Sequence, residues 1–86
     1  MDIGVEISLY PLRPDYLVQI HAFIDRLSGD ERLKVVTNSM STQVFGGFEP
    51  VMDALRGALG ASFASMDSGA GRAVFVMKVF GPLPAA

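Results

Sequence analysis

The sequence contains no cysteine, no tryptophan and a single histidine among its 86 residues. Without cysteine the chain has no disulfide framework, no thiolate zinc site and no thiol nucleophile. One histidine cannot build an imidazole-rich metal site, and chemistry that depends on histidine would have to use His21. These absences favour binding over catalysis, so we expect no enzymatic activity, no cofactor and no metal ion.

Basic residues and long apolar runs are scarce as well. Seven Lys and Arg residues against nine Asp and Glu residues give a net charge of −2, whereas nucleic-acid binding draws its affinity from clustered basic residues. No apolar stretch approaches the ~20 residues that span a bilayer. Residues 1–6 lack the basic and then apolar layout of a signal peptide. We therefore expect neither a nucleic-acid nor a membrane partner, and a cytoplasmic location.

Apolar residues, in contrast, are in excess: they make up 50% of the chain, while charged residues make up 19%. The length allows one domain, over residues 1–86, with a thin core, because a small domain buries a smaller share of its surface than a large one. The outside of so small a body should be polar. The apolar excess therefore suggests that a partner covers part of the surface.

The hydrophobic periodicity changes along the chain and predicts six elements. A half-buried strand is indicated by four alternating apolar residues, Ile3, Val5, Ile7 and Leu9, and an amphipathic helix by four others, Leu17, Ile20, Ile24 and Leu27. Strands are predicted over residues 3–11, 33–37, 42–45 and 72–80, and helices over residues 15–28 and 50–64. This order is the ferredoxin-like βαββαβ pattern of an α+β domain, a four-stranded antiparallel sheet with two helices on one face.

The last predicted strand is apolar on both of its faces. Between residues 73 and 80 apolar side chains occupy both sets of alternating positions, and only Lys78 interrupts them. Two helices can cover only one face of the sheet, and an uncovered apolar face usually marks an interface. We therefore expect a homo-oligomer, a dimer or a tetramer, that assembles through this sheet face or an adjacent strand edge.

No catalytic motif is present: the sequence lacks a phosphate-binding loop, a nucleophile elbow, a zinc-protease helix and a dinucleotide fingerprint. The glycines of residues 69–71 are too few for a phosphate cradle and are better explained as a plain loop. His21 lies toward the edge of the apolar stripe of its predicted helix and is best explained as a half-exposed helical residue.

Two polar segments lie beside the predicted sheet. Glu6, Ser8 and Tyr10 should share the face opposite the helices, where Glu6 would meet a cationic ligand or, as we favour, pair with Lys78. Residues 37–42 form a dense set of hydroxyl and amide groups. Turn chemistry and cross-strand hydrogen bonds are the simpler explanation of this set. The alternative is a small-molecule pocket with an apolar wall, an aromatic ring and a few donors and acceptors.

The same segments carry a family resemblance, mainly through the motifs S-L-Y-P and M-S-T-x-x-x-G. In order and spacing the chain resembles, over roughly residues 5–80, the YkoF-like family of proteins that bind thiamine or hydroxymethylpyrimidine. The matching segments are residues 7–12, 15–16, 23–24, 37–46 and 51–55. The resemblance implies a ferredoxin-like fold, non-catalytic binding of thiamine or its pyrimidine moiety, and assembly through sheets. Some members carry two such domains in tandem, so a chain with one domain is expected to dimerise.

The resemblance also implies which residues contact the ligand. Tyr10 would stack on the aminopyrimidine ring, and Asn38, Ser41 and Thr42 would pair with its nitrogens and amino group. A carboxylate would offset the positive charge of a thiazolium ring. The expected ligand-binding residues are Glu6, Ser8, Tyr10, Asp15, Asn38, Ser41 and Thr42.

Two other hypotheses stay open. The chain is also compatible with a structural or regulatory oligomerisation module similar to ACT domains, with another small ligand or none. A small enzyme is the less favoured alternative. Acylphosphatases share the predicted element order, but residues 11–14 contain two prolines and one cation, Arg13, in place of a loop that binds anions.

Overall fold

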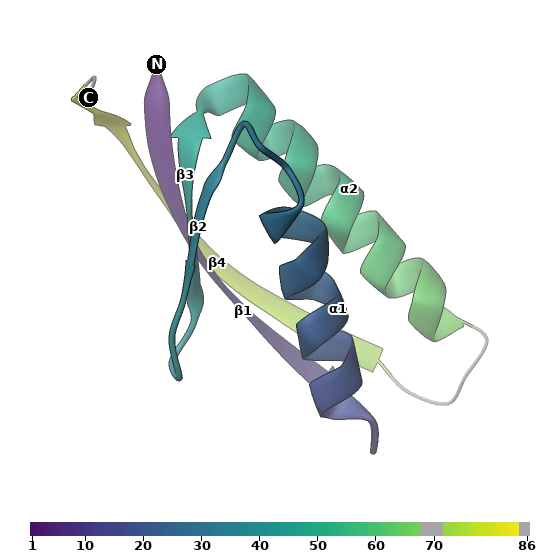
Figure 1. Ribbon diagram of the computed structural model, residues 1–86. Helices are drawn as coiled ribbons and strands as arrows, with labels where there is room; N and C mark the ends of the chain where they lie inside the picture. The colour runs from purple at the N-terminus through teal and green to yellow at the C-terminus, as the bar shows by residue number, and fades with distance from the viewer. Residues whose placement is uncertain (68–71, 85–86) are drawn as a thin grey trace.

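The computed structural model describes residues 1–67 and 72–84, and contains six elements in the predicted order. They are β1 (Asp2–Leu12), α1 (Tyr16–Ser28), β2 (Lys34–Thr37), β3 (Thr42–Gly47), α2 (Phe48–Asp67) and β4 (Arg72–Leu83). The strands form one antiparallel sheet in the order β2-β3-β1-β4, and both helices pack on the same face of it (Figure 1). The ferredoxin-like α+β fold is thereby confirmed, whereas the loop predicted at residues 69–71 lies outside the described residues.

The core lies between the sheet and the helices, and β1 supplies its centre. All four alternating apolar residues of β1 are buried, as the period-2 pattern predicts. They pack against apolar side chains of α1, β3 and α2. The core cluster consists of Ile3, Val5, Ile7, Leu9, Phe23, Leu27, Val44, Val51, Leu55 and Ala58.

The buried face of α1 differs from the predicted stripe. Gln19, Phe23 and Leu27 are its buried residues, whereas Leu17, which the periodicity assigned to the stripe, is 55% exposed. Gln19 can be buried because its side chain is hydrogen-bonded at both ends: Nε2 donates to Asp15, and Oε1 accepts from Ser65 of α2. The helix is therefore rotated so that Phe23, not Leu17, faces the sheet.

Both α2 and β4 are longer than predicted. α2 starts directly after β3 and continues to Asp67. Its Gly57 and Gly60 weaken helical propensity, but Val51, Leu55 and Ala58 anchor the helix in the core, so packing outweighs propensity. β4 continues to Leu83, which pairs with Asp2 of β1 after a shift in register. Among the described residues, neither helix is long and apolar enough to cross a membrane.

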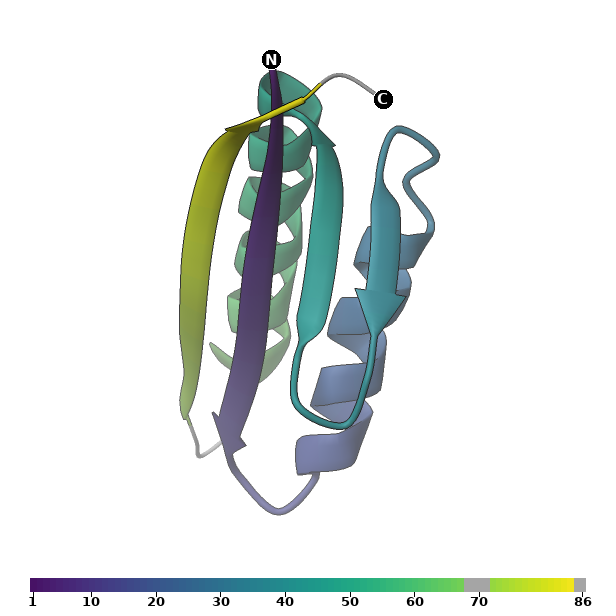
Figure 2. The same cartoon turned by 90° about the vertical axis from the view of Figure 1, so that its left-hand side faces the viewer.

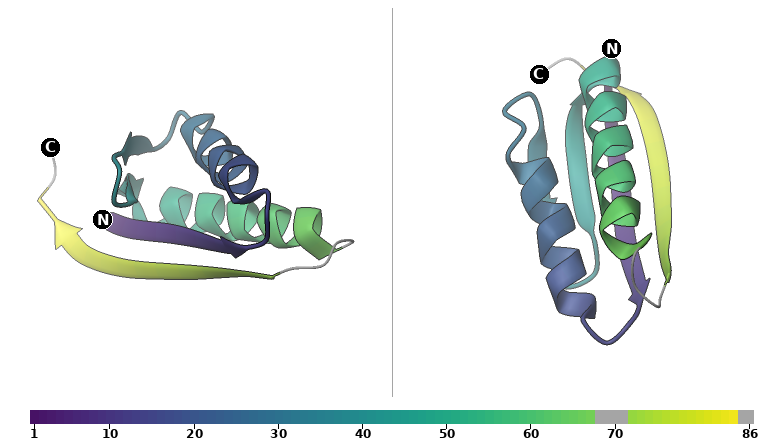
Figure 3. Two further views of the ribbon diagram at one scale, coloured as in Figure 1. Left: turned by 90° about the horizontal axis from the view of Figure 1, so that it is seen from below. Right: turned by 90° about the vertical axis from the view of Figure 1, so that its right-hand side faces the viewer.

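One face of the sheet is left uncovered (Figure 2, in which the helices lie behind the sheet). On this face β4 exposes Val74, Val76 and Phe80. The Phe80 ring covers Gly4, where a methyl group would overlap it, and meets Phe45 edge-on at 6.3 Å between ring centroids. β4 also lies at the edge of the sheet, beyond the cover of α2 (Figure 3), so its opposite face is half-exposed as well.

A comparison of Leu27, which is buried as predicted, with Leu17, which is not, tests the corrected face of α1. Leu27→Ala should lower the free energy of unfolding by about 2–5 kcal/mol, because the side chain is fully buried and its loss leaves a cavity. Leu17→Ala on the same helix should change it by less than about 0.5 kcal/mol, because Leu17 is largely exposed. Urea unfolding measures both, and equal losses would show that α1 docks through the stripe expected from periodicity.

Candidate functional site

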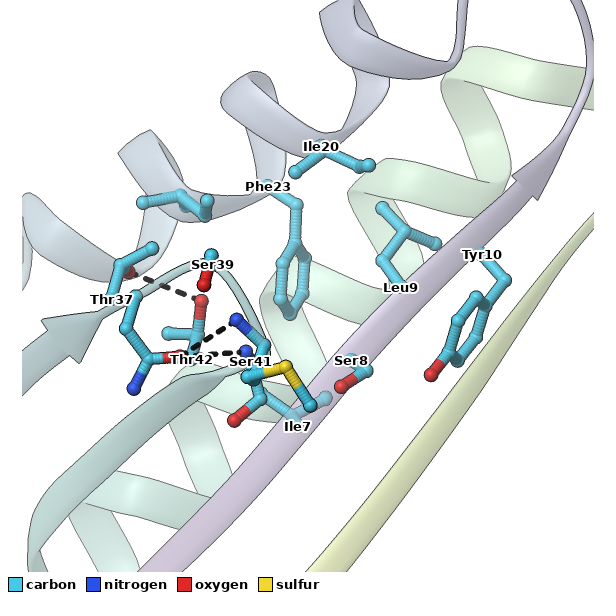
Figure 4. A pocket seen from close by; sticks show the side chains of 13 residues that line it. Ile7, Ser8, Leu9, Tyr10, Ile20, Phe23, Thr37, Ser39, Ser41 and Thr42 are labelled. Atoms are coloured by element: carbon cyan, nitrogen blue, oxygen red, sulfur yellow. Dashed lines mark hydrogen bonds between the residues drawn. The ribbon is translucent and has the colours of Figure 1, made fainter.

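A pocket opens where β1 continues past the end of its neighbour β3. The pairing of β1 with β3 ends at Ile7, which lies opposite Thr42, whereas the pairing with β4 continues to Leu12. At this point the chain turns through residues 38–41, which join β2 to β3. The space that β3 leaves free is bounded by β1, by this hairpin turn and by α1 (Figure 4).

The pocket has a volume of about 260 Å³, and apolar side chains form its inner wall. Phe23 of α1 lies in this wall between the helix and β1 (Figure 4). The apolar wall consists of Ile7, Leu9, Ile20, Phe23 and Ile24, and the remaining lining residues are Ser8, Tyr10, Thr37, Asn38, Ser39, Met40, Ser41 and Thr42. The volume is near the lower end for ligand sites, so it suits a small ring better than a large cofactor.

The turn at the rim of the pocket is held by its own first residue. Asn38 Oδ1 accepts hydrogen bonds from the main-chain N–H groups of Met40, at 2.8 Å, and Ser41, at 3.1 Å. The Asn38 N–H in turn donates to the main-chain oxygen of Ser41 at 3.1 Å. This arrangement is typical of asparagine in a tight turn. It occupies the amide oxygen of Asn38, whereas the amide nitrogen makes no hydrogen bond within residues 1–67 and 72–84.

Thr42 and Thr37 form the hydroxyl pair behind this turn. Their Oγ1 atoms lie 3.1 Å apart across the two strands, and either can donate the hydrogen bond. Thr42 is buried whereas Thr37 is exposed. The structure thus combines the two explanations of the polar segment, because these residues make cross-strand bonds and also line a pocket.

A second hollow, of about 240 Å³, lies on the uncovered face of the sheet beside the pocket. Glu6 lies here: Ser41 Oγ donates to its Oε2 at 3.1 Å, and Lys78 Nζ lies 3.8 Å from its Oε1, the pairing favoured from the sequence. Ser8, Tyr10, Met40 and Ser41 line both the pocket and the hollow, so the two are adjacent.

The expected ligand-binding residues therefore divide into three groups. Ser8, Tyr10, Asn38, Ser41 and Thr42 line the pocket, and Glu6 lines the adjacent hollow. Asp15 lines neither: it lies at the start of α1, where hydrogen bonds from Gln19 and Arg13 lower its pKa. In this structure its carboxylate links Arg13 of the preceding loop to Gln19 of α1. His21 is exposed and lies outside both linings.

Sequence reasoning missed the wall that α1 provides. Phe23 and Ile24 belong to a segment of the family resemblance, but nothing in the periodicity indicated that they face a pocket. Ile20, a residue of the predicted stripe, packs half-buried against the core cluster and also lines the pocket. The signal for this wall in the sequence was that Phe23 accompanies the S-L-Y-P and M-S-T-x-x-x-G motifs in the family resemblance.

The pocket is uncharged. None of its lining residues is Asp, Glu, Lys, Arg or His, so the wall offers hydrogen-bonding hydroxyl and amide groups without a formal charge. Within residues 1–67 and 72–84, no group of three or more metal-ligating acidic or histidine side chains comes together. The arrangement is suited to hold a neutral planar ring by stacking and hydrogen bonds.

The fold and this pocket define a small ferredoxin-like α+β domain with a candidate small-molecule site between its sheet and its first helix. The model of the YKOF-related family matches residues 2–76. The chain therefore belongs to the YKOF-related family. No curated protein matches the sequence.

Solved structures share the fold at low sequence identity. A Streptococcus pneumoniae protein superimposes with a TM-score of 0.84 at 21% identity, over 96% of this chain and 89% of that one. A hypothetical protein from Methanocaldococcus jannaschii gives 0.78 at 22% identity, over 99% and 84%. A proposed thiamine biosynthesis/salvage protein from Thermotoga maritima gives 0.68 at 21% identity, over 95% and 85%. These likenesses show the fold alone.

Substitution of Asn38 tests whether its side-chain oxygen stabilises the turn at the rim of the pocket. Asn38→Ala should lower the free energy of unfolding by about 1 kcal/mol, because two turn N–H groups lose their acceptor. Asn38→Asp should retain most of the stability, since a carboxylate oxygen accepts the same two bonds. Urea unfolding compares them, and an equal loss in both variants would contradict this role of Oδ1.

Proposed function

We propose that the protein binds thiamine or its hydroxymethylpyrimidine moiety without catalysing a reaction on it. The uncharged pocket carries this proposal, because it combines an apolar and aromatic wall with hydroxyl and amide groups at a volume suited to one ring. Membership of the YKOF-related family and the thiamine-related Thermotoga maritima structure support it. Six residues of the two motifs of the family resemblance also line the pocket: Ser8, Leu9, Tyr10, Met40, Ser41 and Thr42.

The charges around the site favour the unphosphorylated compounds. No Lys or Arg lines the pocket, and the one cation of the adjacent hollow, Lys78, is paired with Glu6. A pyrimidine ring in the pocket would place the thiazolium of thiamine toward the hollow, where it can replace the exposed Lys78 ammonium as the partner of the Glu6 carboxylate. A phosphate group would find no comparable partner there.

Calorimetric titration tests this function. Hydroxymethylpyrimidine and thiamine should bind saturably, and thiamine diphosphate should bind no more tightly than thiamine. Tyr10→Ala should weaken binding roughly fivefold to tenfold through the loss of ring contact. Tyr16→Ala is the matched control, since Tyr16 is similarly exposed, at 50% against 54%, but lies outside the pocket lining. Absence of heat and of a thermal shift with both compounds at millimolar concentration would refute the proposal.

We also propose that the protein associates with a second copy of itself through β4 and the uncovered sheet face. β4 is a twelve-residue edge strand that pairs only with β1 among the described strands, so its outer row of main-chain groups is open. Long unprotected edges with apolar side chains favour pairing with another chain. The Val74, Val76 and Phe80 side chains form an apolar surface suited to packing against its own copy.

The oligomeric state decides this second proposal. Sedimentation or size-exclusion chromatography at micromolar concentration should show a dimer or tetramer, and Val76→Glu should shift it toward monomer. Val18→Glu is the control, because Val18 is a valine of comparable exposure on α1, away from the sheet. A monomeric wild-type protein would overturn the proposal. Association without any pyrimidine binding would instead favour the structural-module alternative.

A further inference from the structure

The register of the sheet shows which main-chain groups of β1 point toward the pocket. The Phe48 N–H donates to the Met1 C=O at 2.9 Å, which continues the β1–β3 register beyond the pair of Asp2 and Gly47. In an antiparallel ladder such bonded pairs alternate with non-bonded pairs. The odd-numbered residues of β1 therefore direct both their N–H and their C=O toward β3.

A hydrogen bond in the hairpin of β2 and β3 gives the same orientation of the β1 main chain independently. The bond from Asn38 N–H to Ser41 C=O assigns the odd-numbered residues of β3 to the β2 side. Even-numbered residues, including Thr42, then face β1, as the pairing of Thr42 with Ile7 requires. The register of β1 against β4 is unbroken from Gly4 to Leu12, so the alternation continues through Leu9.

Leu9 is the first odd-numbered residue of β1 beyond Ile7, where the pairing with β3 ends. Its register partner would be Met40, but the Met40 N–H is already bonded to Asn38 Oδ1 in the turn. Leu9 is 8% exposed and lines the pocket. Among the described residues its inward N–H and C=O have no partner in the β3 ladder or in the turn, so both groups are left for a molecule that enters the pocket.

Pro11 limits what can pair with this edge. As the next odd-numbered residue it directs its C=O to the same side, but proline has no N–H. A peptide strand added at this edge would therefore lack a hydrogen-bond donor at Pro11, one position after Leu9 in the ladder. The free edge therefore offers one donor and one adjacent acceptor on Leu9, which suits a small ring better than a strand.

We propose that the main chain of Leu9 is the recognition element of the pocket and selects a planar heterocycle with an amino group next to a ring nitrogen. The ring nitrogen accepts the Leu9 N–H, and the amino group donates to the Leu9 C=O. This inference rests on the proposed binding of a pyrimidine, whose aminopyrimidine edge carries this pair of groups. The new element is that specificity for the ligand comes from the main chain of Leu9, whereas Thr42 and Asn38 line the pocket beside it.

Amide hydrogen exchange followed by NMR on the full chain tests the donor. In the free protein the Leu9 amide should exchange faster than that of Ile7, which faces Thr42 in the ladder. Hydroxymethylpyrimidine at ten times its dissociation constant should slow the Leu9 amide about tenfold. The Ser8 amide is the internal control: it faces β4 and should be protected in the free protein as that of Ile7 is, so any slowing there reports overall stabilisation and not contact with the ligand.

A ligand analogue tests the acceptor. The pyrimidine that lacks only the amino group should bind about tenfold more weakly, because it leaves the Leu9 C=O without a donor. If hydroxymethylpyrimidine binds in the calorimeter but the Leu9 amide is unchanged, or both pyrimidines bind equally, this inference is wrong and the proposed function stands. If neither pyrimidine binds, both are wrong.

Discussion

The unequal lengths of the two neighbours of β1 determine the rest of this structure. Over its first half β1 is paired on both sides, and its inward side chains form the centre of the core. Beyond Ile7 only β4 remains beside it. The same strand therefore supplies the most tightly packed part of the molecule and one wall of its pocket. A longer β3 would fill the pocket with its own main chain.

The pocket connects the two faces of a thin domain. Ser8 and Tyr10 lie on the uncovered face, and Leu9 between them lies on the helix face, yet all three line the pocket. This is possible only at the end of a ladder, where no neighbouring strand separates the two sides. A ligand at this position can touch the apolar layer under α1 and the polar surface around Glu6 at once.

The sequence predicted the fold well because its strongest signals are local. The alternation in β1 and the order of the six elements depend on neighbouring residues alone, and both are confirmed. The rotation of α1 could not be predicted, because burial of Gln19 depends on Ser65, 46 positions away. For the same reason the motif residues of the strands and turn were named in advance, while the wall that Ile20 and Phe23 form was not.

The short turn of residues 38–41 has a consequence for the thermodynamics of the site. Its shape is set by hydrogen bonds that span no more than three positions in the chain, so the rim forms whether or not the pocket is filled. A loop that must become ordered when a ligand arrives loses conformational entropy, and the observed affinity falls accordingly. In this protein that entropy is lost during folding, so ordering of this turn would not reduce the affinity for the proposed ligand.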